Sequence, residues 1–230
     1  MIWYWILLIF GGFLLGSVMF CQIIPKVFLH KDIYEISEDH NSGTFNVYKY
    51  CGMKVAIPCL ILDMLKGFVP VLIASLLMDT DNVAFSLVLV APVLGHAVGL
   101  FNKFHGGKCV ATSFGVTLGL IPVAWIAFAV QLTLFILLST LIKVKPRNAR
   151  CVAVYVLFAV IVCTTLGVLG QGYVALGCGL VALLPILKFA VLKRNFTAET
   201  SSVAASSVAE NNPEINSAEE NIIGANDPEK

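Results

Sequence analysis

The apolar residues of this chain are gathered into blocks, and most blocks are about twenty residues long. A helix of that length crosses the roughly 30 Å of hydrocarbon in a lipid bilayer. The composition agrees, because 58% of the residues are hydrophobic and only 13% are charged, whereas soluble domains average about 45–50% and about 25%. The sequence therefore predicts an all-α fold, a polytopic bundle of membrane helices.

The blocks predict seven transmembrane helices, one of them short, within a domain that covers residues 1–194. The fourth and fifth helices come from one apolar run, residues 109–142, which is too long for a single crossing. We divide this run at Pro122, because a proline disfavours helical geometry in the residue before it. The expected spans are residues 2–24, 53–78, 83–101, 110–121, 123–142, 151–169 and 173–192.

The two ends of the chain differ in character. No positively charged segment precedes the first apolar block, so we expect a retained span rather than a removed signal peptide. Residues 195–230 are rich in Ser, Ala, Glu and Asn, and they carry too little apolar surface to offset the entropy lost on folding. This segment is predicted to be a disordered cytoplasmic tail.

Lys and Arg are distributed unevenly between the expected connections. They are frequent in residues 25–52, 102–108 and 143–150, and absent from the short turns at 79–82, 119–122 and 170–172. Connections rich in Lys and Arg stay on the cytoplasmic side of a membrane. The N-terminus is therefore expected outside, and the basic connections inside.

The most informative of the basic connections is the stretch HGGKCVATSFG, residues 105–115. Gly106 and Gly107 give the backbone freedom, Lys108 adds a charge, and a helix follows directly. Unpaired N–H groups at a helix N-terminus favour an anion, and Thr112 and Ser113 offer hydroxyl groups one turn further on. The stretch indicates a phosphate site, although a flexible turn with a cytoplasmic lysine has the same pattern.

Two charged residues and a histidine lie inside expected spans. Asp63 and Lys66 are three residues apart, so they share one face of a helix. Charges within a membrane usually face the bundle interior or a wet cavity; the pair either orients a cation toward a substrate or simply neutralises itself so that the span can insert. His96 is a candidate acid, base or hydrogen-bond donor, or a bridge between two helices.

The polar segment before the second span contributes further candidates. Asn41 and Asn46 flank Gly43, and their amides are suited to the hydroxyl groups of a polyol. Lys49 is suited to a phosphate. The cysteines lack CxxC spacing, and no cluster has metal-ligand spacing. We expect no metal, no cofactor and no nucleic-acid partner, and the sequence does not indicate an oligomeric state.

Three motifs together resemble the bacterial acyl-phosphate:glycerol-3-phosphate acyltransferase family. They are GSVMF at residues 16–20, LDMLKGFVPV at 62–71 and GHAVGLFNKFHGGKCVAT at 95–112. The resemblance implies a seven-span enzyme of the cell inner (plasma) membrane with a cytoplasmic active face. Its expected partners are acyl phosphate, glycerol 3-phosphate and membrane lipid. The implied reaction transfers the acyl group to the sn-1 hydroxyl of glycerol 3-phosphate, giving lysophosphatidic acid for phospholipid biosynthesis.

The resemblance and the residue chemistry together define the expected site. Lys108 and its loop are expected to hold acyl phosphate, and the remaining polar residues to hold glycerol 3-phosphate or support the site. The expected catalytic residues are His96, Lys108 and Lys66. The expected substrate-binding residues are Asn41, Gly43, Asn46, Lys49, Asp63, Gly106, Gly107, Thr112 and Ser113.

The chain departs from the family pattern in two places. The family usually has a Gly-Ser-Gly-Asn-x-Gly-Ala-Thr-Asn-x-x-Arg stretch, in which Asp39 here replaces the serine, Phe45 the threonine and Lys49 the arginine. The C-terminal Arg-His-x-x-Asn motif is not recognisable in ILKFAVLKRNF, residues 186–196. A non-catalytic relative that binds lipid or anions is therefore the alternative to an acyltransferase. A small transporter ranks third, because the inverted repeat typical of that class is missing.

Overall fold

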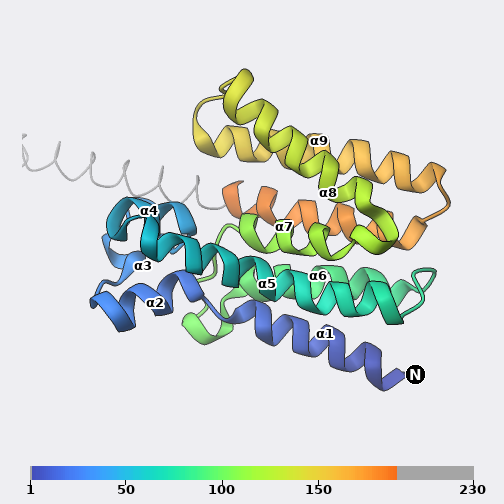
Figure 1. The fold of residues 1–230 in the computed structure, drawn as a ribbon, viewed down its shortest axis with the longest axis horizontal. Helices are drawn as coiled ribbons and strands as arrows, with labels where there is room; N and C mark the ends of the chain where they lie inside the picture. The colour runs from blue at the N-terminus through green and yellow to red at the C-terminus, as the bar shows by residue number, and fades with distance from the viewer. Residues whose placement is uncertain (1, 191–230) are drawn as a thin grey trace, which may run out of the picture. The chain divides into compact units, whose positions relative to one another are not determined.

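The computed structural model describes residues 2–190, and every regular element in that part of the chain is a helix (Figure 1). The expected tail, residues 195–230, and the last two residues of the expected seventh span lie outside the described residues. The helices are α1 (Ile2–Ser17), α2 (Phe20–Leu29), α3 (Ile33–Ile36), α4 (Thr44–Cys51), α5 (Met53–Leu77), α6 (Val83–Val98), α7 (Val110–Gly119), α8 (Ile121–Ile136), α9 (Arg147–Val168) and a last helix, Gly172–Ala190. Two short turns, η1 (Leu100–Asn102) and η2 (Leu137–Leu141), extend α6 and α8.

Five of these helices are long and apolar enough to cross a membrane, and the bent pair α1–α2 brings the candidates to six. The chain is thus an all-helical, multi-pass membrane protein. The expectation of one continuous helix over residues 2–24 is wrong, because α1 and α2 meet at an angle of 42°. The break expected at Pro122 is confirmed, since α7 ends at Gly119 and the proline lies in the first turn of α8.

Glycines allow two pairs of helices to approach backbone to backbone. A Cβ atom on Gly67 of α5 would lie 2.3 Å from a backbone oxygen of α7, and one on Gly115 of α7 would lie 2.0 Å from a backbone oxygen of α5. Gly16 and Gly95 relate α1 and α6 in the same way, each with 2.1 Å to the other helix. Small residues at such crossings are how membrane helices gain packing energy without a hydrophobic driving force.

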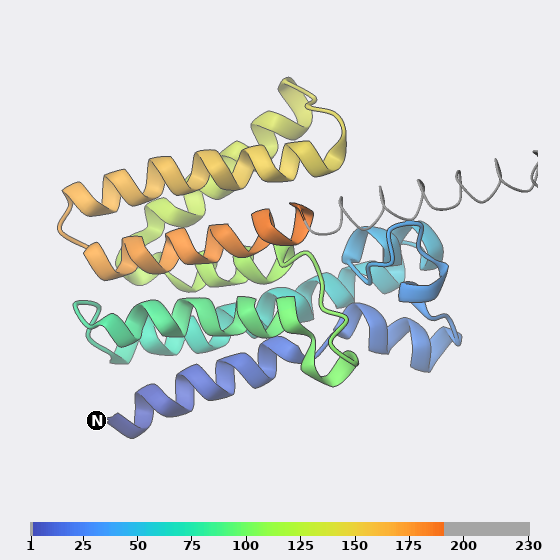
Figure 2. The ribbon, with the colours of Figure 1, turned by 180° about the vertical axis from the view of Figure 1, so that it is seen from behind.

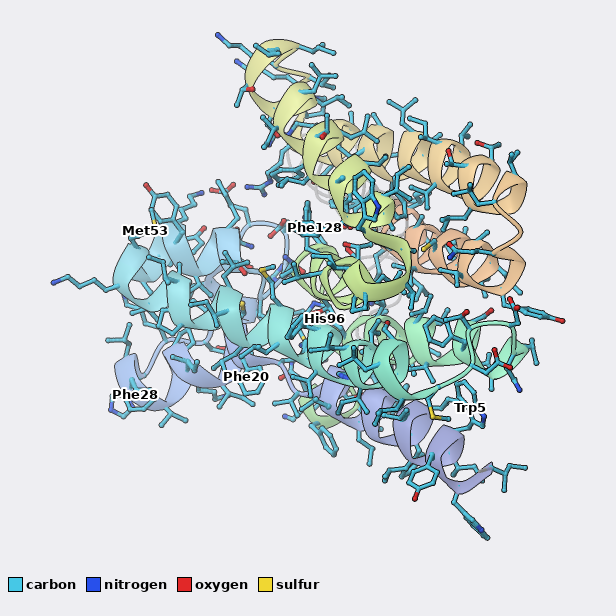
Figure 3. The ribbon with its side chains drawn as sticks, turned by 45° about the vertical axis from the view of Figure 1, so that its right-hand side comes forward. Trp5, Phe20, Phe28, Met53, His96 and Phe128 are labelled. Atoms are coloured by element: carbon cyan, nitrogen blue, oxygen red, sulfur yellow. The ribbon has the colours of Figure 1, made fainter. Side chains whose placement is uncertain are left out.

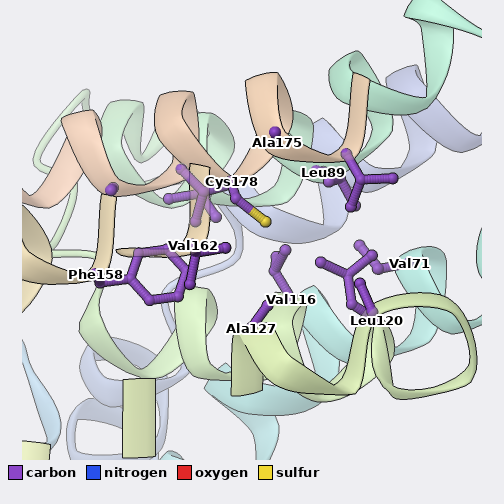
Figure 4. Packing of buried hydrophobic residues seen from close by; sticks show 14 of the residues in the cluster. Val71, Leu89, Val116, Leu120, Ala127, Phe158, Val162, Ala175 and Cys178 are labelled. Atoms are coloured by element: carbon purple, nitrogen blue, oxygen red, sulfur yellow. The ribbon is translucent and has the colours of Figure 1, made fainter. Parts of the chain in front are cut away.

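The main apolar core lies between α5, α6, α7, α8, α9 and the last helix. Figure 4 shows Val116 of α7 and Leu120, which follows α7, close to Val71 of α5. Phe158 of α9 and Cys178 of the last helix belong to the same fully buried cluster. This packing holds α7 in the interior of the bundle, so the loop that precedes it has a fixed position.

The polar segment between α1 and α5 forms short helices instead of an open connection. Helices α2, α3 and α4 gather at the end of the bundle away from the N-terminus (Figures 1 and 2). A second small core, with Cys21, Ile33, Val47 and Cys59 fully buried, joins them to the start of α5. The loop between α3 and α4 is thereby brought close to the loop that precedes α7.

Candidate active site

A cavity of about 510 Å³ lies between the short helices and the bundle. One part of its lining is polar and comes from segments far apart in the sequence. These residues are Asn41, Gly43, Thr44, Asn46, Asp63, His96, Lys108, Arg147 and Arg150. The lining carries three basic side chains and one carboxylate, and Asp63 is already paired with a lysine outside the lining. The cavity therefore favours an anion.

Lys108 belongs to this polar part of the lining. Its Nζ lies 2.6 Å from Oδ2 of Asp39, and the lysine side chain is only 11% exposed. The amide of Asn46 donates a 2.7 Å hydrogen bond to the other oxygen of the same carboxylate. Burial by itself raises the pKa of Asp39, but Lys108, Asn46 and Arg147 outweigh it and hold the pKa below its usual value. Asp39 is therefore an anion bound at the cationic site.

The glycines before Lys108 let the loop run directly over α6. The N–H of Gly107 donates to the carbonyl oxygen of His96, at 3.0 Å. A Cβ atom on Gly107 would lie 2.3 Å from Nε2 of His96, and one on Gly106 would lie 2.0 Å from the carbonyl oxygen of Ala97. The two glycines thus allow the loop to pack closely against the end of α6. This packing fixes the position of Lys108. Figure 3 labels His96 at this junction.

Two arginines at the start of α9 complete the basic lining. Arg147 stacks on the ring of Phe45, with its guanidinium carbon 3.7 Å from the ring centre, and lies 3.8 Å from Asp39. Arg150 follows one turn later. Sequence reasoning assigned both arginines only to the positive-inside pattern. The available signal was the density of basic residues in 143–150, directly before a span.

The pair formed by Asp63 and Lys66 is tied to the break between α1 and α2. The two charged groups lie 2.9 Å apart, and both side chains are almost fully buried. The ammonium group of Lys66 also donates, at 2.7 Å, to the carbonyl oxygen of Val18, which the break leaves outside the helix ladder. Cys21 donates to the second oxygen of Asp63, at 3.1 Å. Lys66 therefore stabilises the bend, and Asp63 alone of the pair lines the cavity.

The remaining lining of the cavity is apolar. It contains Leu60, Met64, Phe114, Phe128, Leu132 and Phe135, of which Phe128 is labelled in Figure 3. The rings of Phe114 and Phe135 meet edge to face, with their centres 5.5 Å apart. An apolar wall beside a basic pole suits a ligand with a hydrocarbon chain and an anionic head.

The cavity brings together six of the residues expected from the sequence, and the others lie elsewhere. The lining includes Asn41, Gly43, Asn46, Asp63, His96 and Lys108, whereas Lys49, Lys66, Gly106, Gly107, Thr112 and Ser113 are not part of it. Lys49 forms an ion pair with Glu38.

The hydroxyl group of Ser113 bonds to Tyr155 within a buried network that also contains Gln131 and Thr117. Thr112 is fully buried, and its hydroxyl group has no partner among residues 2–190. The hydroxyl group of Ser113 therefore helps to join α7 to α8 and α9. Within the same residues, no group of three or more His, Cys, Asp or Glu side chains could hold a metal ion.

The fold and this cavity define a multi-pass membrane protein with an amphipathic, anion-attracting site. The family model described as glycerol-3-phosphate acyltransferase matches residues 6–198. The chain is 36% identical over 181 residues to the glycerol-3-phosphate acyltransferase of Maridesulfovibrio salexigens, covering 78% of this chain and 87% of that protein. It is 31% identical to the enzyme of Lactococcus lactis subsp. lactis, covering 73% and 76%.

Two solved structures have the same fold. One is PlsY (YgiH), an integral membrane glycerol 3-phosphate acyltransferase, in its glycerol 3-phosphate form, with a TM-score of 0.68, 28% identity and 85% and 92% of the two chains covered. The other is its lysophosphatidic acid form, with a TM-score of 0.65 and 29% identity over 84% and 92%. The chain belongs to the glycerol-3-phosphate acyltransferase family. Its identification from the sequence as a membrane acyltransferase of phospholipid biosynthesis is confirmed.

Proposed function

We propose that this chain transfers an acyl group from acyl phosphate to the sn-1 hydroxyl of glycerol 3-phosphate, with Lys108 as the central binding and catalytic cation. The observation that carries the proposal is the shared cavity, in which Lys108, Arg147 and Arg150 lie beside a wall of phenylalanine, leucine and methionine side chains. The basic pole suits the phosphate groups of both substrates, and the apolar wall suits the acyl chain.

The proposed reaction needs positioning and charge stabilisation more than an added nucleophile. The sn-1 hydroxyl oxygen attacks the acyl carbon, a new C–O bond forms, and the bond from that carbon to the phosphate oxygen breaks. The hydroxyl proton passes to a phosphate oxygen of the substrates, and inorganic phosphate leaves. Lys108 stabilises negative charge that grows on the departing phosphate, while the amides of Asn41 and Asn46 orient the glycerol hydroxyls.

The other expected residues have supporting roles in this proposal. Gly106 and Gly107 hold Lys108 in place through their contact with α6, and the buried ring of His96 supports that contact. Lys66 and Asp63 hold the bend between α1 and α2 that carries the short helices. Lys49, Thr112 and Ser113 do not line the cavity, so contact with substrate would need a rearrangement of their side chains.

The test uses purified full-length protein in proteoliposomes, supplied with acyl phosphate and labelled glycerol 3-phosphate. Wild type should form labelled lysophosphatidic acid, and Lys108→Ala should lower kcat by about a hundredfold or more. Lys54→Ala is the matched control, because Lys54 is an exposed lysine on α5 outside the cavity. Turnover by Lys108→Ala close to that of wild type would refute the site.

The ion pair of Asp39 with Lys108 favours the alternative, a non-catalytic relative that binds lipid or anions. In that case the carboxylate permanently occupies the place of a substrate phosphate. The same assay separates the two, because a non-catalytic relative yields no labelled lysophosphatidic acid in the wild type.

We also propose seven crossings with the N-terminus outside and the cavity facing the cytoplasm at the inner (plasma) membrane. Three observations support this topology: the bent pair α1–α2, the five long helices and the short apolar helix α7. With ten residues α7 is about 15 Å long, about half of the hydrocarbon thickness, so in this topology the residues that flank α7 complete the fourth crossing. A membrane domain over residues 1–194 and a cytoplasmic tail over 195–230 complete the proposal. The test is protease treatment of intact cells and of inside-out vesicles. Cleavage of the tail in the vesicles but not in the cells would support the topology, and cleavage in the cells would overturn it.

A further inference from the structure

Arg147 is held at the cavity by a close contact with the ring of Phe45. Its guanidinium carbon lies 3.7 Å above the centre of the Phe45 ring, close enough for stacking. A stacked guanidinium keeps its N–H groups in a plane that is free for hydrogen bonds. Phe45 comes from α4 and Arg147 from the start of α9, so the contact exists only because the two segments meet.

The N–H groups of Arg147 are not used by other side chains in residues 2–190. Its nearest carboxylate oxygen there, Oδ2 of Asp39, lies 3.8 Å away, beyond hydrogen-bond distance, and the same oxygen is 2.6 Å from Lys108. One anionic oxygen thus sits between two cations but satisfies only one of them. A phosphate group is larger than a carboxylate and has more acceptor oxygens, so it can reach both.

We propose that Arg147, stacked on Phe45, is a phosphate-binding residue that acts together with Lys108. The inference rests on the proposed function and adds a residue to its site. Arginine suits this task because its planar fork can donate two parallel hydrogen bonds to one phosphate. When substrate enters, its phosphate displaces the carboxylate of Asp39 from between Lys108 and Arg147.

Lys49 is the competing candidate for this role, because it lies on the same helix as Phe45. Its ammonium group pairs with Glu38, lies 5.2 Å from the ring centre of Tyr50, and is outside the cavity lining. Phe45 and Arg147 both line the cavity. The geometry thus favours Arg147 over Lys49 as the second cation at the phosphate.

The first experiment measures kcat and KM of Arg147 variants in proteoliposomes, varying glycerol 3-phosphate and acyl phosphate separately. Arg147→Ala should raise one or both KM values about ten- to a hundredfold, with a much smaller fall in kcat. The substrate whose KM rises identifies which phosphate Arg147 holds. The KM of Arg147→Lys should lie between those of wild type and Arg147→Ala, because lysine keeps the charge but cannot donate two parallel hydrogen bonds to one phosphate. Lys145→Ala removes an equal charge from an exposed position outside the lining and should leave both KM values unchanged.

The second experiment tests the role of the aromatic ring. Phe45→Leu keeps an apolar side chain but removes the stacking surface, so it should raise the same KM several-fold. Combined with Arg147→Ala it should add little, because the two residues act through one contact. Full additivity of the two effects would overturn the link between Phe45 and Arg147.

A binding measurement separates failure of this inference from failure of the proposed function. Titration calorimetry of glycerol 3-phosphate and of a non-hydrolysable acyl phosphonate into the detergent-solubilised full chain needs no turnover. If wild type makes no lysophosphatidic acid but Arg147→Ala still binds either ligand at least tenfold more weakly, the proposed function fails and the inference stands. Unchanged Kd and KM values in folded Arg147→Ala, for both ligands, would overturn it.

Discussion

Nζ of Lys108 lies 2.6 Å from Oδ2 of Asp39, although the two residues are 69 positions apart in the chain. The contact joins the loop before α4 to the glycine loop before α7. It places the carboxylate of Asp39 beside the basic lining of the cavity, held by Lys108 and the amide of Asn46. At the proposed site, a substrate phosphate therefore competes with a side chain of the protein.

Removing the charge of Asp39 should strengthen substrate binding. In Asp39→Asn the carboxamide is a weaker competitor for Lys108, so the KM for the phosphate-bearing substrate is expected to fall about fivefold, the equivalent of a partly exposed ion pair worth about 1 kcal/mol. The measurement is the proteoliposome assay with both substrates varied. Glu38→Gln removes a carboxylate that pairs with Lys49 outside the cavity and serves as the control. A KM that rises in Asp39→Asn would show instead that the carboxylate positions Lys108 for substrate.

The same ion pair predicts how stability responds to acid. Because the folded state holds the pKa of Asp39 below 3.8, the unfolded state binds its proton first as the pH falls. The contribution of Asp39 to stability is therefore complete above about pH 5 and is lost as the pH falls through the folded pKa. Thermal unfolding in detergent should show wild type more stable than Asp39→Asn at neutral pH. The difference should shrink as the pH falls below the usual pKa of an aspartate and disappear once Asp39 is protonated in the folded state. A difference that grows on acidification would contradict this.

Adding a methyl group to the glycine loop should move Lys108 away from its position in the cavity. The Cβ of Gly106→Ala would lie 2.0 Å from the carbonyl oxygen of Ala97, so the loop must move away from α6 and take Lys108 with it. Activity is expected to fall at least tenfold, with little change in helix content by circular dichroism. Gly11→Ala is the control, because a Cβ there meets nothing within 4 Å. Full activity of Gly106→Ala would show that the position of Lys108 does not depend on this packing.

Breaking the buried ion pair of Asp63 and Lys66 should lower the stability of the folded protein more than it lowers the rate of acyl transfer. Lys66→Met leaves the carboxylate of Asp63 buried without its cation, which typically destabilises a protein by about 3–5 kcal/mol. The double variant Asp63→Leu/Lys66→Met removes both charges and should recover part of the loss. Unfolding temperatures in detergent measure both effects. If Lys66→Met is as stable as wild type but inactive, Lys66 acts on substrate rather than on the bend.

Much of the fold followed from local patterns along the chain. Blocks of apolar residues predicted the helices, and the geometry of Pro122 predicted the break between α7 and α8, because both are properties of neighbouring residues. The bend between α1 and α2 was missed because no proline or charge marks Ser17 to Met19. It is stabilised by Lys66, 48 residues beyond Val18, and such a distant partner leaves no local signal.

Three features could be predicted from the order of the residues alone: helices that span a membrane, a glycine loop ending in Lys108, and the motifs of an acyltransferase family. Which charged groups meet near the cavity depends instead on how the helices pack. In the folded protein Lys49 forms an ion pair with Glu38, Arg147 lies over the ring of Phe45, and Asp39 forms an ion pair with Lys108. The reason is physical: helix formation depends on residues within a turn or two of each other, whereas an ion pair depends on where packing places segments that are far apart in the chain.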